Sequence, residues 1–391
     1  DSGKTDADQA QIISWLIRHH IVDIRSEKLA DLTAIKAHIA NLSNQVPEPM
    51  RAVAMLDADG FDERVFVRGN HGSLGEKTPR AFLSSLAGTD QPSIESGSGR
   101  MELARRMTDP SDPLLSRVMV NRLWHHLLGR GIVASVDDFG KMGERPSNPQ
   151  LLDYLADDFR THGWSIKRMI RQIMLSRTYQ MSSRAADADA ERQDPNNILL
   201  HRANLRRLEA EEIRDSMLAA SGRLDLTMFG PSVDVHLTEF MEGRGKPKSG
   251  PLDGAGRRSI YLAVRRNFLS PMMLAFDAPA PFNTMGRRSV SNVPAQALML
   301  MNDPFVLQQA KKWAGHIASQ NELSARQRIA AMYETAFSRP ATDREIDRAL
   351  QFMESQSKEL GIASVPSDLN PAAWTDLAHG LMNAKEFIFL N

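Results

Sequence analysis

Residues 117–183 read RVMVNRLWHHLLGRGIVASVDDFGKMGERPSNPQLLDYLADDFRTHGWSIKRMIRQIMLSRTYQMSS, and this stretch decides the expected fold. Apolar side chains recur in it at spacings of three and four residues, which is the period of an α-helix. The pattern predicts helices over 113–128, 148–161 and 165–176, and Pro149 suits the first turn of the second helix. The stretch therefore indicates a domain built from packed helices.

The same period continues along most of the remaining chain. It predicts a mainly α protein, a multi-helix globular domain with a long N-terminal helical arm and a small β element. We expect the helical arm over 1–46, a small β and loop segment over 47–92, and the helical domain over 93–391. The further predicted helices span 101–107, 208–220, 304–319, 323–337, 343–359 and 371–385.

The sequence also allows predictions for the arm and for the segments between these helices. Helical periodicity in the arm runs through 6–44 with almost no helix breakers. Met55, with Val53, is expected to form a short β pair with residues 65–67 across a turn. Residues 223–258 are rich in glycine and proline and predict a long loop, either functional or mobile. Apolar residues alternate over 257–266, which indicates a lone strand.

Composition excludes several classes of protein. Lys and Arg together number 48, as do Asp and Glu, so the net charge is zero and we expect no nucleic-acid partner. The chain has no cysteine, which excludes disulfides, iron–sulfur clusters and thioether-attached haem within it. It has no apolar run of about 18 residues, so we expect no membrane-spanning helix. Because it begins at Asp1 without an initiator Met, we expect a fragment or a processed product of a larger precursor.

A polar cluster follows the apolar face of the 113–128 helix. Asn121, Arg122 and His125 lie on its second side, and Asp137 and Asp138 follow in the next turn. Half-buried polar groups need partners, so the cluster predicts either a pocket for an anionic or hydroxyl-rich ligand or a buried structural network. Neighbouring histidines on a helix point about 100° apart and chelate poorly, so we predict no metal site.

A second group of charges lies in HRANLRRLEAEEIRD, residues 201–215. Arg207, Glu211 and Asp215 are spaced four apart, as in a ladder of ion pairs along one helix face. Alternatively, Glu211 and Asp215 act as paired carboxylates in a cleft, which general acid–base catalysis would require. Both interpretations remain open at the level of sequence.

A third group lies in residues 263–303, where arginine pairs alternate with amides and prolines. Arginines near amides are suited to hold a carboxylate or sulfate in bidentate fashion. They are equally suited to hold an aspartate and the ends of neighbouring helices. The candidate ligand-binding residues in this segment are Arg265, Asp277, Arg287, Gln296 and Asn302.

Several long phrases of the sequence match a known family in the family's order. Besides 117–183, they include VRGNHGSLGEKTPRAFL (67–83), RRSIYLAVRRN (257–267), AFDAPAPFNTMGRRSVSNVPAQALMLMNDPFV (275–306) and LMNAKEFIFLN (381–391). Through these phrases the chain resembles the planctomycete-type domain of unknown function that accompanies planctomycete cytochrome c domains. The resemblance covers roughly residues 50–391.

The resemblance implies an exported protein, periplasmic or extracellular, with a role in polysaccharide metabolism. It also implies a cytochrome c domain or a second domain from the same precursor as partner, so any haem would reside in that separate piece. Three functions follow as hypotheses. The favoured one is an enzyme or enzyme subunit acting on complex glycans, and the alternatives are a non-catalytic glycan-binding or assembly module and a structural cell-envelope protein. For the first, the catalytic candidates are Glu211, Asp215, His125 and Asp138.

The enzyme hypothesis makes a geometric prediction. The segments 121–138, 207–215 and 265–302 should unite in one cleft. The residues expected to converge are Arg122, His125, Asp138, Arg207, Glu211 and Arg287.

Overall fold

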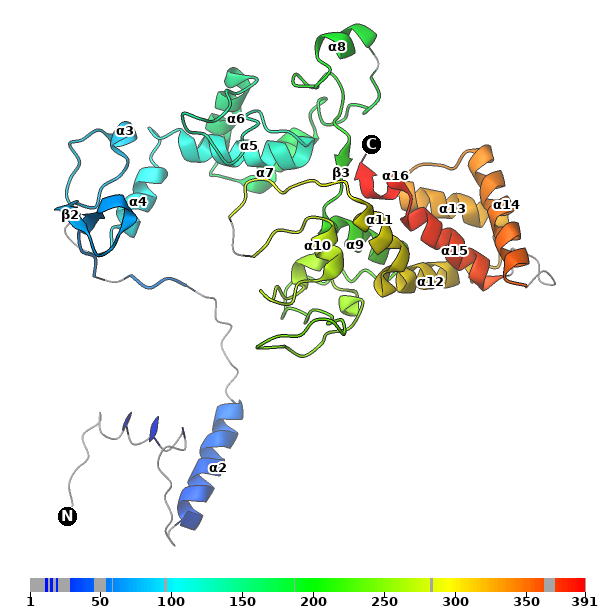
Figure 1. Ribbon diagram of the computed structural model, residues 1–391, viewed down its shortest axis with the longest axis horizontal. Coiled ribbons are helices and arrows are strands. Elements are labelled where there is room, and N and C mark those ends of the chain that lie inside the picture. The colour runs from blue at the N-terminus through cyan, green and yellow to red at the C-terminus, as the bar shows by residue number, and fades with distance from the viewer. Residues whose placement is uncertain are drawn as a thin grey trace. The chain divides into compact units, whose positions relative to one another are not determined.

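The computed structural model describes residues 11–12, 15–16, 19, 29–45, 54–57, 59–94, 97–185, 187–281, 284–361 and 370–390. The described chain is mainly helical, as predicted, and its only sheets have two strands each (Figure 1). It divides into two compact units, Asp1–Ala81 with Thr89–Met101 and Phe82–Gly88 with Glu102–Asn391. The domain boundaries expected after residues 46 and 92 stay predictions.

The predicted arm is represented by helix α2, Leu29–Gln45, and by helical positions at 11, 12, 15 and 16. Residues 6–44 were expected to form one long helix or a helical hairpin; His19 is in a turn, and the rest of this segment lies outside the described residues. Ile35, Ile39 and Leu42 follow one stripe of α2, and each is about half exposed. None of the described helices combines the length and the apolar character that a bilayer crossing requires.

The β element is a hairpin of β1, Arg64–Phe66, and β2, Leu74–Lys77. The prediction that Val53 and Met55 supply the partner strand is wrong, since 54–57 form no strand and Val53 lies outside the described residues. The actual partner, β2, lies in the glycine-rich stretch that follows Phe66. At Gly75 a β-carbon would come within 3.3 Å of the Val65 carbonyl oxygen, so glycine allows the two strands to approach closely.

Helices α5, α6 and α7 form the first core of the second unit. They span Leu114–Leu128, Pro149–Thr161 and Ile166–Met174, close to the predicted bounds. Trp124 is 8% exposed and packs with apolar side chains of α6 and α7. The side chain of Asn148 accepts a hydrogen bond from the Leu151 amide, which fixes the start of α6.

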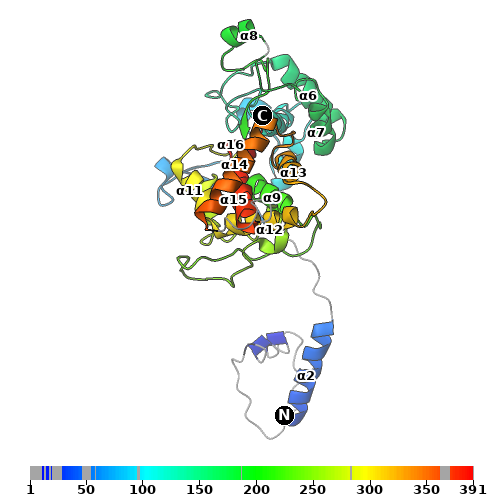
Figure 2. The same ribbon diagram turned by 90° about the vertical axis from the view of Figure 1, so that its right-hand side faces the viewer.

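The larger core lies among the helices that follow. Trp313 and Trp374 are buried at its centre, where α12 packs against α15 (Figure 1). Figure 2 shows these helices from the side of α14 and α15. The helices are α9 (Ala210–Ala220), α10 (Pro271–Ala275), α11 (Pro294–Asn302), α12 (Pro304–Ala318), α13 (Ala325–Phe337), α14 (Asp343–Glu359), α15 (Pro371–Met382) and α16 (Lys385–Ile388).

Each helix predicted from residue 101 onward is present, and α4 accounts for the first of them as Arg100–Met107. Not predicted were α10 and α11, as well as α3 (Ser84–Ala87) and α8 (Ala188–Gln193). Both α10 and α11 begin with a proline in their first turn, a position that proline favours.

The glycine-rich loop that follows α9 is held by a buried arginine. Arg214, 4% exposed, donates hydrogen bonds to the carbonyl oxygens of Asp253 and Arg257 and to the Ser259 hydroxyl. Asp253 in turn forms an ion pair with Lys312. The loop therefore has an internal anchor.

The lone strand predicted over 257–266 is not observed. Residues Ser259–Tyr261 form a 3₁₀ turn, and the segment makes only isolated bridges, such as that of Val233 with Leu262. Ile260 and Val264 are 77% and 70% exposed, so the apolar alternation does not mark a buried strand face.

The second sheet brings the C-terminal end of the chain back to the residues before α9. Its strands are β3, Arg206–Arg207, and β4, Phe389–Leu390. Nearby, Arg339 forms ion pairs with Glu345 of α14 and Glu386 of α16. The hydrogen bonds from Arg339 lower the pKa of Glu345 to about 2. These contacts fix the C-terminal residues beside β3.

Candidate functional site

Segments far apart in the sequence meet at one small pocket of the second unit. The end of α5, the stretch from β3 into α9, and residues between α10 and α11 supply its walls. The pocket has a volume of about 90 Å³. Its lining includes His125, His126, Arg206, Arg207, Glu209 and Arg288.

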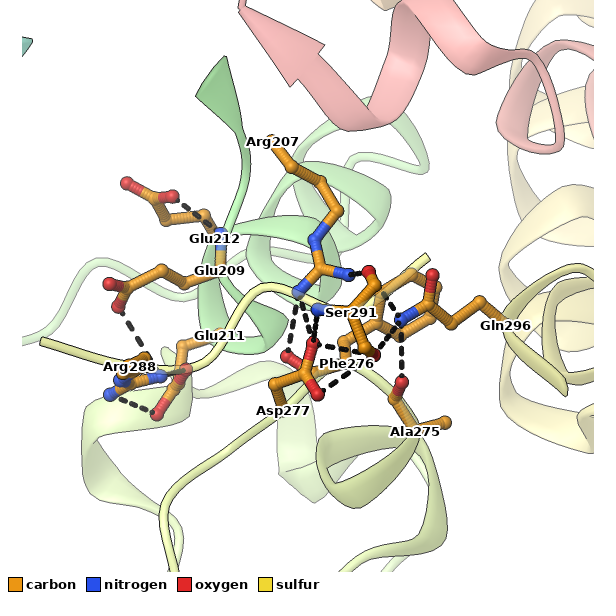
Figure 3. Close-up of polar contacts among 10 residues, drawn as sticks. All are labelled: Arg207, Glu209, Glu211, Glu212, Ala275, Phe276, Asp277, Arg288, Ser291 and Gln296. Carbon is orange, nitrogen blue, oxygen red and sulfur yellow. Dashed lines mark hydrogen bonds and ion pairs between the residues drawn. The ribbon is translucent and has the colours of Figure 1, made fainter. Parts of the chain in front are cut away.

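Arg207 is the central side chain of this region. It is 8% exposed, and one of its terminal nitrogens, Nη2, lies 2.6 Å from the Asp277 carboxylate. The other, Nη1, donates to the Ser291 carbonyl oxygen at 2.5 Å. Figure 3 shows the guanidinium directed between Asp277 and Ser291, with Gln296 on the far side of the serine. The second residue of β3, Arg207, thus extends its side chain into a buried hydrogen-bond network.

Asp277 completes this network from the other side. It accepts hydrogen bonds from the Ser291 amide at 2.8 Å and from the Ser291 hydroxyl at 2.9 Å. Burial by itself raises the pKa of Asp277, but the hydrogen bonds from Arg207 and Ser291 outweigh it and hold the pKa below its usual value. The residue has φ +63°, a strained conformation that its contacts maintain. Asp277 is therefore a charged partner of Arg207 at neutral pH.

A second ion pair lies beside the first. Arg288 donates both terminal nitrogens to Glu211, at 2.6 and 3.1 Å, and lies 3.3 Å from Glu209 (Figure 3). Burial raises the pKa of Glu211, but the Arg288 fork reverses that effect and lowers it overall. A bidentate arginine pair is among the strongest ways to keep a carboxylate ionised.

His125 lies on the pocket wall without a hydrogen-bond partner. Its Nδ1 atom is buried, and no partner for it is found in the described part of the chain. Burial, followed by repulsion from His126 and Arg287, lowers the pKa of His125 to about 4. The imidazole is therefore neutral at physiological pH.

The rest of the polar cluster predicted on α5 has structural contacts. Asn121 is fully buried, and its amide exchanges two hydrogen bonds of 2.9 Å with the backbone of Val133. Asp137 accepts a hydrogen bond from the Gly286 amide, and Asp138 accepts one from the Gly140 amide. Asn121 and Asp138 thus fix the turn after α5 rather than line the pocket.

The predicted ladder of ion pairs along one helix face is not observed. Helix α9 begins at Ala210, so Arg207 is not part of it. Asp215 accepts hydrogen bonds from the amide and hydroxyl of Ser259, at 2.8 and 2.7 Å. Glu211 and Asp215 therefore have separate partners from later segments, and the contacts do not match paired carboxylates in a cleft.

The remaining candidates occupy several places. Gln296 is buried and donates to the Ala275 carbonyl oxygen and the Ser291 hydroxyl, so it supports the Arg207 network. Arg265 lies 3.7 Å from Asp234 on the surface, and Asn302 bonds its own helix at Leu298. Neither Arg265 nor Asn302 is among the pocket's lining residues.

The last two arginine candidates differ in burial. Arg287 is exposed and forms no hydrogen bond or ion pair with the residues that the structure describes. Arg122 has a buried Nε atom that likewise lacks a partner there. Of the six residues expected to converge, His125 and Arg207 line the pocket, and Glu211 is bound to a lining residue, Arg288.

Several pocket residues were not among the candidates. They are His126, Arg206, Glu209 and Arg288, together with Ser291 behind the wall. The doublets Arg206-Arg207 and Arg287-Arg288 were a usable signal, because each concentrates positive charge at one point of the chain. Arg206 and Arg207 both line the pocket and pair with Glu212 and Asp277, and Arg288 of the second doublet pairs with Glu211. Among the described residues, no group of three His, Asp or Glu side chains could hold a metal ion.

Comparison with known proteins gives the chain a family. No curated protein and no solved structure matches it. A family model described as PSD1, protein of unknown function (DUF1553), matches residues 99–353, which is more than half of the chain. That range contains all the pocket residues named above. The chain therefore belongs to the PSD1 family of proteins of unknown function (DUF1553).

Proposed function

We propose that this chain is a non-catalytic glycan-binding module of an exported planctomycete-type protein, and that it works beside a cytochrome c domain. The glycan, the export and the cytochrome partner follow from the resemblance described above. The non-catalytic character follows from one observation, the pairing of the carboxylates around the pocket with arginines. Asp277 is bound by Arg207, and Glu209 and Glu211 are bound by Arg288.

This pairing opposes the chemistry of a glycoside hydrolase. Such an enzyme needs one carboxylic acid with a raised pKa to protonate the leaving oxygen, and a second, ionised carboxylate beside it. Here the pKa of Glu211 and that of Asp277 are both lowered. His125 has a pKa of about 4, so it is neutral at neutral pH and is not the imidazolium that would serve as a general acid. The pocket therefore lacks a general acid of the usual kind within the described residues.

The size of the pocket supports recognition of one substituent rather than enclosure of a sugar ring. Sites for whole small molecules have volumes of roughly 300–1,000 Å³. This pocket, at about 90 Å³, is far smaller. A glycan would insert one group and lie across the surface around it.

A glycan array probed with the full chain, followed by product analysis of the bound sugars, tests this proposal. We expect retention of a glycan without new chain ends, with and without a haem-bearing partner. Arg207→Met should weaken retention, whereas Arg265→Met, a change at an exposed arginine, should not. The appearance of new reducing ends would contradict the non-catalytic role. The absence of binding to any sugar on the array would contradict the proposal that the chain binds a glycan.

A further inference from the structure

We infer that the pocket formed by the end of α5, β3 and the segment between α10 and α11 binds a single oxyanion group. The group would be a sulfate, a phosphate monoester or a carboxylate. Its identification as the acidic substituent of a glycan rests on the proposed function. The oxyanion site itself rests on the hydrogen-bond donors and the size of the pocket.

Two buried nitrogens of the pocket residues lack partners. Arg207 is 8% exposed, and its Nε atom has no hydrogen bond within the described chain, although both terminal nitrogens do. Figure 3 shows Nε on the edge of the guanidinium away from Asp277. His125 Nδ1 is likewise buried without a partner among the described residues. Native proteins pair nearly all such groups, so two at one pocket indicate a missing ligand, which would accept from Arg207 Nε and from His125 in its Nδ1–H tautomer.

The hydrogen-bond donors of the lining select an oxygen-rich ligand. Arg206, Arg207 and Arg288 line the pocket with the single carboxylate of Glu209, and their other ion-pair partners, Asp277, Glu211 and Glu212, lie outside the lining. Guanidinium groups only donate hydrogen bonds, so the ligand must supply acceptor oxygens. Arg206 lies 3.6 Å from Glu212, its nearest ion-pair partner, and so keeps donors for a ligand.

The volume of the pocket limits the ligand to a small group. At about 90 Å³ the pocket is far smaller than the roughly 300–1,000 Å³ of sites that enclose whole small molecules. That space suits one oxyanion with its oxygens directed at surrounding donors. Phe276 supplies an apolar wall, which strengthens electrostatic attraction by excluding water.

His125 gives this site a spectroscopic reporter. The charged or titratable groups that act on it are His126 on the same helix, Arg206 of β3, Arg287 of the later segment and Asp137 of the following turn. Burial and the three cationic or titratable neighbours oppose its protonation, and Asp137 favours it. A bound oxyanion would add negative charge beside the ring and raise the pKa of His125.

The test is an NMR pH titration of the His125 ring in the full chain, in sodium chloride, sodium sulfate, sodium phosphate or sodium acetate at equal ionic strength. We expect one or more of the three oxyanions to raise the pKa of His125 by at least one unit over chloride. The anion with the largest shift identifies the class of ligand. An identical titration in all four salts would overturn the inference.

Two variants separate binding from folding. Arg207→Lys keeps a positive charge beside Asp277 but removes the Nε donor. It should lower the affinity for the oxyanion that gives the largest shift at least tenfold. Arg265→Lys is the matched control at an exposed site and should bind as the wild type does. Equal affinity of all three proteins would contradict the assignment to this pocket. Oxyanion binding together with a blank glycan array would refute the proposed function and leave the oxyanion site supported.

Discussion

The replacement of Arg207 by Met tests whether the buried ion pair holds the second unit together. Methionine keeps most of the apolar stem but removes the hydrogen bonds to Asp277, Ser291 and Phe276. Breaking a buried pair by removing one partner costs about 3–5 kcal/mol. Because Asp277 is 18% exposed and keeps both Ser291 donors, we expect about 3 kcal/mol, the lower end of that range.

Urea unfolding of the full chain, followed by tryptophan fluorescence, measures this loss. Trp313 and Trp374 are buried in the core beside the network, so their emission reports unfolding of this unit. At roughly 2 °C for each kcal/mol in a domain of this size, the melting temperature should fall by about 6 °C.

The control is Arg265→Met. Its ion pair with Asp234 is 3.7 Å long between side chains that are 55% and 41% exposed, and exposed pairs contribute less than about 1 kcal/mol. If Arg207→Met loses no more stability than Arg265→Met, the claim that Arg207 anchors the pocket is refuted.

Four further predictions concern the pH dependence of stability and the backbone at two glycines. The pKa of His125 is about 4 in the folded protein, against an ordinary histidine value of 6.5. The free energy of unfolding should therefore decrease as the pH falls from 6.5 to 4. H125Q should lose less stability than the wild type over that interval, as measured by urea unfolding. Glu345 stabilises the fold above its ordinary pKa of 4.5, and this contribution is lost as pH falls through about 2; E345Q should therefore be less stable at neutral pH and show a flatter acid profile by circular dichroism. Gly315→Ala should raise stability by about 0.5–1 kcal/mol because the β-carbon meets open space within a helix. Gly250→Ala should lower the melting temperature in calorimetry, since its β-carbon would lie 1.8 Å from the Asp234 carbonyl oxygen.

The helices could be predicted because their signals are local. Thr342 is an example, since its side chain caps α14 and pairs with Glu345 three residues later in a capping box. The side chains of Asn148 and Ser165 also cap α6 and α7, by accepting hydrogen bonds from the amides of Leu151 and Arg168. Trp124 falls on the apolar side of its helix by this periodicity, and it is buried in the core. A short-range pattern is sufficient for each of these features.

The pocket depends on contacts that no local pattern contains. Arg207 and Asp277 are 70 positions apart, and Arg288 and Glu211 are 77 apart. Strand β3 has two residues and pairs with two residues at the other end of the domain, too short for a periodic signal. Glu211 and Asp215 do lie on one helix, as their spacing predicted. Their partners, Arg288 and Ser259, come from later segments of the chain. The charged residues could therefore be identified from the sequence, whereas their ion-pair partners could not.

A crystal of the full chain grown with selenate, an oxyanion with strong anomalous scattering, tests the central claim most directly. We predict an anomalous peak inside the pocket, with selenate oxygens at roughly 2.7–3.2 Å from Arg207 Nε and His125 Nδ1. Anomalous density only at other positions, with water or nothing beside those two nitrogens, would contradict the claim that this pocket is an oxyanion site.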